Sequence, residues 1–96
     1  MRKIKIQHLG YTIFVKRPNK NIPFPMYVER NNRHTSTIYI KQPIKKINQP
    51  LLAHEVLHIL QNISADYGID MIYEKEHFAY LLSYIMNVIL NYEYDT

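Results

Sequence analysis

Two histidines and a glutamate lie close together in one short segment of the chain. Residues 54–58 read His-Glu-Val-Leu-His, so His54 and His58 are four positions apart and Glu55 follows the first. On a helix, residues four apart share one face, and two imidazoles in this arrangement can bind one metal ion. The sequence has no cysteine, so any ligands must be nitrogen or oxygen atoms. We therefore predict a zinc ion bound by His54 and His58, with Glu55 positioned to act as general base on a zinc-bound water molecule.

Two histidines do not complete a catalytic zinc site, which usually has three protein ligands and one open position. Several downstream side chains could supply the third ligand: Asp66, Asp70, Glu74, Glu76 and His77. Asp66 is two turns beyond His58 on the same predicted helix, and we do not expect it to reach back.

Spacing alone leaves Glu74 and Glu76 about equally placed, with His77 third. Glu74 lies nearer the apolar stripe of the second predicted helix. Glu76 instead begins a second stripe that includes the small residues Ala79 and Ser83. Small residues are needed where two helix backbones approach closely, so that stripe could press against the first helix and deliver Glu76 to the ion.

The hydrophobic period divides the chain into two halves. Up to about residue 45, apolar and polar residues alternate as in strands, interrupted by turn residues. The expected strands span residues 2–9, 11–15, 26–28 and 35–41. After Pro50 the period becomes helical, and Asn48 is a plausible N-cap. Gly68 should end the first helix near residue 67, and a second helix should follow over about 74–92.

These elements predict one α+β domain over residues 1–96. Its sheet half, residues 1–45, should form a small antiparallel sheet of three to four strands. Its metal-binding half, residues 46–96, should form two packed helices. A chain of this length buries only about two thirds of the surface that it exposes when unfolded, so the core should be modest.

Two motifs resemble those of a known family. Residues 52–58 read Leu-Ala-His-Glu-Val-Leu-His, and after seventeen further residues 76–81 read Glu-His-Phe-Ala-Tyr-Leu. This pattern resembles the zincin-like metallopeptidases, whose third zinc ligand is a glutamate on the following helix. It is most similar to minimal, phage-associated zincin-like proteins, in which a short sheet precedes the two helices.

The resemblance implies a set of roles and an activity. His54, His58 and Glu76 would be the zinc ligands, Glu55 would be the base, and residues 35–41 would correspond to the edge strand that pairs with extended substrate. The expected activity is zinc-dependent hydrolysis of peptide bonds in a peptide or protein substrate. The alternative is a non-catalytic binding protein that keeps zinc as a structural staple and contacts a host factor.

The charge is unevenly distributed along the chain. Residues 1–50 hold eleven Lys and Arg against one acid, whereas residues 51–96 hold one Lys against seven acids. The basic half could attract an acidic partner, although lysines on short strands more often simply discourage edge pairing. We do not expect nucleic-acid binding. No apolar segment has the length of a signal peptide or a membrane span, so we expect a cytoplasmic protein and no membrane partner.

Overall fold

Alternating apolar and polar residues in the first half of the chain produce four strands. The computed structural model describes residues 2–19 and 22–91. The strands are β1 (Arg2–Ile6), β2 (Tyr11–Lys16), β3 (Met26–Asn32) and β4 (Thr35–Ile40). Two helices follow, α1 (Gln49–Tyr67) and α2 (Lys75–Leu90). The chain also forms two short 3-10 helices, η1 (Gln7–Leu9) between β1 and β2 and η2 (Ile44–Lys46) between β4 and α1. The predicted α+β architecture, a small sheet followed by two helices, is confirmed.

The sheet is mixed, whereas the sequence analysis expected antiparallel pairing throughout. Its order is β1-β2-β4-β3: both outer pairs are antiparallel, and the central strands β2 and β4 run parallel. In this order β3 lies two strand positions from β2, and β4 returns into the position between them. The expectation of a wholly antiparallel sheet was wrong because hydrophobic alternation reports which face is buried and not which strand is the neighbour.

The position of β4 corrects a second expectation. The resemblance made residues 35–41 an edge strand, but β4 is hydrogen-bonded to β2 on one side and to β3 on the other. An extended peptide cannot add to a strand whose two edges are already paired. Among the described residues, β1 and β3 form the two edges of the sheet.

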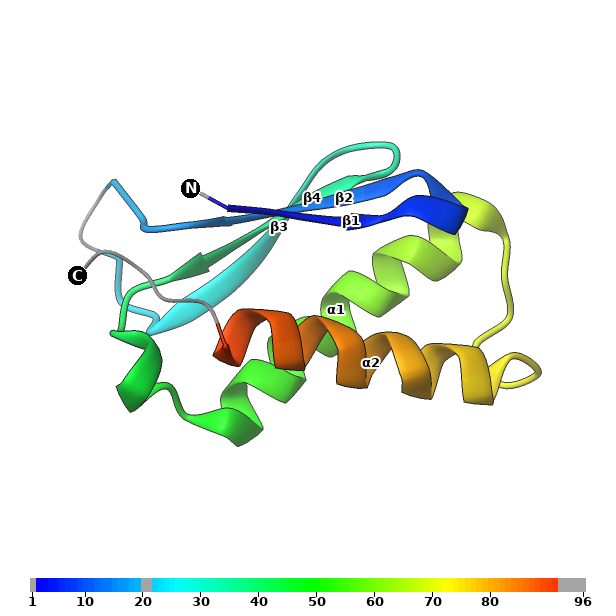
Figure 1. Cartoon of the computed structure of the whole chain (residues 1–96). Helices are drawn as coiled ribbons and strands as arrows, with labels where there is room; N and C mark the ends of the chain where they lie inside the picture. The colour runs from blue at the N-terminus through cyan, green and yellow to red at the C-terminus, as the bar shows by residue number, and fades with distance from the viewer. Residues whose placement is uncertain (1, 20–21, 92–96) are drawn as a thin grey trace.

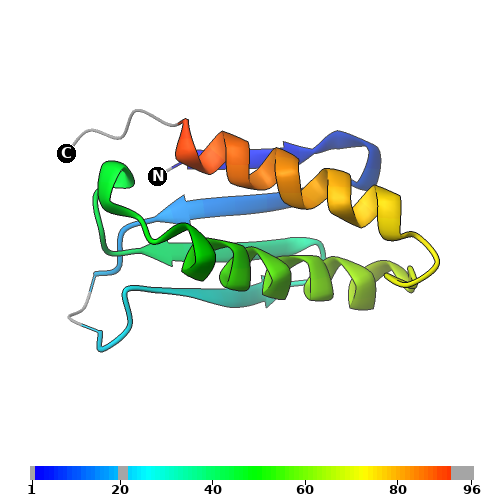
Figure 2. The same cartoon turned by 90° about the horizontal axis from the view of Figure 1, so that it is seen from below.

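Both helices cover the same face of the sheet (Figure 1). Seen from below, α1 crosses the side of β4 and β3, while α2 lies on the side of β1 (Figure 2). The core between the layers is apolar, and its fully buried members include Ile13, Ile38, Val56, Ile59 and Ile85. Burial of these side chains is the main favourable contribution to folding. Within the described residues, no helix is long and apolar enough to cross a bilayer.

The two helices run antiparallel (Figure 2), and their boundaries follow local signals. The Asn48 side chain accepts a hydrogen bond from the Leu51 backbone N–H at 3.0 Å, which confirms the predicted N-cap. Gly68 ends α1 with a left-handed backbone at φ 63°, a conformation that costs glycine little. Because the chain reverses here, the first turn of α2 lies at the same end of the molecule as the last turn of α1.

Candidate metal centre

The roll of α1 about its axis determines where the two histidines point. Its buried residues, Leu52, Val56, Ile59, Leu60 and Ile63, repeat at three- and four-residue spacing and face the sheet. At 100° per residue, His54 and His58 fall on the opposite side of the helix. Both are exposed, so packing of the core presents the predicted ligands to solvent.

The two imidazoles have a spacing that suits one metal ion. Their Nε2 atoms lie 3.2 Å apart, and the rings are nearly perpendicular, at 88°. Two nitrogens each about 2.05 Å from a tetrahedral zinc ion would be separated by about 3.3 Å. The separation of the two nitrogens is therefore close to the one that zinc requires.

Gln61 supports this arrangement from the next turn. Its side-chain Oε1 lies 3.0 Å from Nδ1 of His58. An amide oxygen only accepts, so this hydrogen bond favours the tautomer with the proton on Nδ1, and Nε2 of His58 then offers its lone pair to the Nε2–H of His54 or to a metal. The sequence analysis did not assign Gln61 a role, although its position three residues after His58 on a helix is a usable signal.

Glu55 completes a three-residue cluster. Its Oε2 lies 3.9 Å from Nε2 of His54, and the ligand atoms of His54, Glu55 and His58 all lie within 4.8 Å of one another. The Glu55 side chain is only 12% exposed, against 62% for His54. The carboxylate is therefore held beside the imidazoles and partly sheltered from water, as a base acting on one bound molecule requires.

Two residues on the same side of α1 as Glu55 show which part of the sheet this side faces. Asn62 and Asp66 follow it by seven and eleven residues, which places them on the same side of α1. Asn62 donates to Ser36 Oγ at 3.1 Å, and Asp66 accepts from the backbone N–H of His34 at 3.0 Å. Glu55 therefore lies on the side of α1 that faces the β3–β4 hairpin.

The structure does not bring Glu76 into this cluster. After His58, α1 continues for nine residues to Tyr67, about 14 Å along its axis. Glu76 is in the first turn of α2, at that far end, and its side chain is exposed. The stripe that was to press it against α1 is exposed at Ala79 and Ser83 as well. Glu76 as third ligand thus rests on the resemblance alone.

The other downstream candidates also lie elsewhere. Glu74 is the exposed N-cap of α2, and His77 is in the first turn of the same helix. The Nε2 atom of His77 lies 2.9 Å from that of His8, which belongs to η1 between β1 and β2. The two are 69 positions apart, so spacing could not have revealed their contact.

Comparisons of the chain with models of protein families, with curated proteins and with solved structures found no match. The resemblance to zincin-like proteins is therefore limited to the two short motifs. What supports a function is the geometry of His54, Glu55 and His58.

Proposed function

We propose that the protein binds one zinc ion at His54 and His58 and hydrolyses peptide bonds with Glu55 as general base. The observation that carries the proposal is the cluster itself: two exposed imidazole nitrogens 3.2 Å apart, with a sheltered carboxylate 3.9 Å from one of them. Two imidazoles leave further coordination positions of the ion open to water and substrate. Exposure of both rings favours such an open site over a covered structural metal.

The chemistry divides between the ion and the chain. A bound zinc ion supplies Lewis-acid chemistry, polarising the scissile carbonyl and making water acidic enough to attack near neutral pH. The Glu55 carboxylate takes the proton of the attacking water and delivers it to the leaving amine. The hydrogen bond from Nδ1 of His58 to Gln61 holds that imidazole in the tautomer with a free Nε2.

Among the described residues β3 forms one edge of the sheet, and this edge offers a place for extended substrate. β3 is the edge strand of the hairpin that faces the Glu55 side of α1. A peptide that adds to an edge strand gains main-chain hydrogen bonds whatever its sequence. In this arrangement β3 takes the role that the resemblance gave to residues 35–41.

The test is hydrolysis of an unfolded polypeptide by the zinc-loaded protein. Glu55→Gln keeps the size of the side chain but cannot accept the proton, so we expect it to retain zinc and lose activity by about 100-fold or more. Glu74→Gln makes the same chemical change at a remote exposed residue and should leave activity unchanged. Equal activity in Glu55→Gln and the wild type would exclude Glu55 as the base.

The outer face of the sheet supports a second candidate function, binding of an acidic protein. Neither helix of the described residues covers this face (Figure 1). Lys3 and Lys16 lie over the ring of Phe14 at 5.7 and 5.6 Å, and Tyr27 stacks on Tyr39 with ring centroids 4.6 Å apart. The basic side chains complement the charge of an acidic surface, and the aromatic rings beside them supply apolar contact area.

Binding of an acidic polypeptide such as polyglutamate at low and high salt tests this candidate. Lys3→Gln together with Lys16→Gln should weaken it, whereas Lys75→Gln on α2 should not. A single-stranded oligonucleotide serves as a second probe, and we expect no appreciable binding of it at physiological ionic strength. Tight, salt-sensitive oligonucleotide binding would instead favour a nucleic-acid partner.

A further inference from the structure

A second pair of histidines joins two elements that are distant in the sequence. His8 belongs to η1, between the first two strands, and His77 belongs to the first turn of α2. Their Nε2 atoms lie 2.9 Å apart, with ring centroids separated by 5.1 Å. His77 is half-buried and His8 is exposed, so the pair is anchored on one side and reached by solvent on the other.

Neighbouring contacts fix both partners. The turn that carries His8 is closed by the Gly10 backbone N–H, which donates to the Gln7 carbonyl at 3.1 Å. The same turn is tied to the end of α1, because the Tyr67 hydroxyl donates to the Leu9 carbonyl. On the other side, Phe78 is buried in the core and sets the roll of α2 next to His77. The meeting of the two rings is therefore imposed by the fold.

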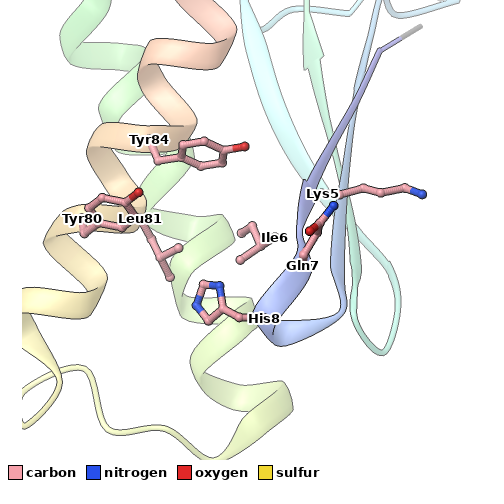
Figure 3. Close-up of a pocket in the computed structure, with 7 residues that line it drawn as sticks. All are labelled: Lys5, Ile6, Gln7, His8, Tyr80, Leu81 and Tyr84. Atoms are coloured by element: carbon pink, nitrogen blue, oxygen red, sulfur yellow. The ribbon is translucent and has the colours of Figure 1, made fainter.

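A pocket of about 250 Å³ adjoins His8. It lies between β1 and α2, and Figure 3 shows the His8 ring pointing into this space toward Leu81, with Tyr80 and Tyr84 along α2. Tyr80 and Tyr84 are both exposed. The pocket leaves room beside the His8 ring for water or another small ligand to fill further coordination positions.

We infer that His8 and His77 form a second binding site for a divalent transition-metal ion of the zinc, copper and nickel class. Two nitrogens each about 2.05 Å from an ion are about 2.9 Å apart when they subtend 90° at it, the angle between adjacent ligands in octahedral or tetragonal coordination. Imidazole is a preferred ligand for these metals and a poor one for Mg²⁺ and Ca²⁺. The separation of the two Nε2 atoms therefore suits an ion with this geometry, whereas tetrahedral Zn²⁺ needs them about 0.4 Å farther apart.

This site differs from the His54–His58 pair in what it connects. An ion at His54 and His58 joins two consecutive turns of one helix. An ion at His8 and His77 instead joins the β1–β2 hairpin to α2, so the unfolded chain cannot hold the two ligands in place. Because the ion binds the folded state preferentially, it stabilises the fold by mass action. If a metal staples this small protein, His8 and His77 are the residues that hold it.

The test uses the full chain carrying His54→Gln and His58→Gln, which removes the first site. We expect this double variant to bind one Zn²⁺ per chain. Zinc at ten times its dissociation constant should raise the thermal midpoint by about 5 °C or more. Mg²⁺ at the same concentration should neither bind nor stabilise. Adding His8→Gln, or separately His77→Gln, should abolish both the bound zinc and the gain in midpoint.

Gln7→Ala in the same background is the matched control, since it changes the neighbouring pocket residue but no imidazole, and it should keep both effects. Far-ultraviolet circular dichroism without metal shows which variants are folded, and having two alternative variants keeps the test valid if one fails to fold. The inference is overturned if the double variant binds no zinc, or if zinc binding survives both His8→Gln and His77→Gln. Neither result bears on the His54–Glu55–His58 site.

Discussion

Oδ2 of Asp66 accepts a hydrogen bond from the backbone N–H of His34 at 3.0 Å, which ties the last turn of α1 to the turn between β3 and β4. The other carboxylate oxygen pairs with the guanidinium of Arg30. The Asp66 side chain is fully buried, whereas that of Arg30 is about half exposed. His34 has a left-handed backbone, φ 70°, so this carboxylate also holds a turn conformation that is uncommon for residues other than glycine.

Asp66→Asn should therefore destabilise the protein. The amide keeps the size of the side chain but loses the charge that pairs with Arg30, and its single oxygen can accept from Arg30 or from the His34 N–H but not from both. We expect a loss of about 1–3 kcal/mol in the free energy of unfolding, measured by urea denaturation. Glu74→Gln, the same change at an exposed site, should cost less than about 0.5 kcal/mol. Equal stability of the two variants would contradict a stabilising role for Asp66.

The N-cap of α1 should contribute to stability separately. Asn48→Ala removes the acceptor of the Leu51 N–H and should cost about 1 kcal/mol. Gln49→Ala, at the next position, which is also exposed, should have little effect. Denaturation of both variants measures the difference, and a cost at Gln49 as large as that at Asn48 would argue against side-chain capping.

Tyr11 should make the protein sensitive to alkaline pH. Burial raises the pKa of the Tyr11 hydroxyl above its usual value of about 10, and the hydrogen bond to Ser36 Oγ at 2.5 Å partly opposes this effect. The folded state thus holds the phenolic proton more tightly than the unfolded state. Its contribution is fully present below pH about 10 and is lost as the pH rises through the raised pKa.

Tyr11→Phe tests this dependence. The variant should lose about 1 kcal/mol near neutral pH, because Ser36 loses a partner, yet its stability should fall less steeply above pH 10 than that of the wild type. Tyr73→Phe is the control, since Tyr73 is 86% exposed. Parallel stability curves for Tyr11→Phe and the wild type above pH 10 would contradict the assignment.

Much of the fold followed from local patterns, and the failures were non-local. Hydrophobic period and the signals at Asn48 and Gly68 placed α1 at Gln49–Tyr67 as expected. The third strand was expected over residues 26–28 but extends to Asn32. Residues 29–32 form a strand because they pair with β4, and their own composition does not indicate this. The parallel pairing of β2 with β4 was missed for the same reason.

The candidate site divides in the same way. His54, Glu55 and His58 come together because four-residue spacing on a helix is local geometry. The expected position of Glu76 depended on how far α1 runs beyond His58 and on which face of α2 turns inward. Neither can be predicted from the motif at residues 54–58. The contact between His8 and His77 has no signal in a single sequence.

Glu76→Gln distinguishes the resemblance from the geometry. If Glu76 is a third ligand, the variant should lose zinc affinity at the His54–His58 site by about tenfold or more, and stability should fall with it. The structure places Glu76 at the far end of α1, and from this we expect an affinity within about twofold of the wild type. Competition with a chromophoric chelator measures the affinity, and Glu74→Gln is the matched control.

Side-chain ¹H–¹⁵N correlation spectra of the histidines during a zinc titration test the central claim most directly, because they report each imidazole nitrogen separately. The His54–Glu55–His58 site predicts that the Nε2 resonances of His54 and His58 shift together and reach saturation at one ion for the pair. It also predicts that Nδ1 of His58 stays protonated through its hydrogen bond to Gln61. Unchanged Nε2 resonances of His54 and His58 at saturating zinc would contradict the metal centre.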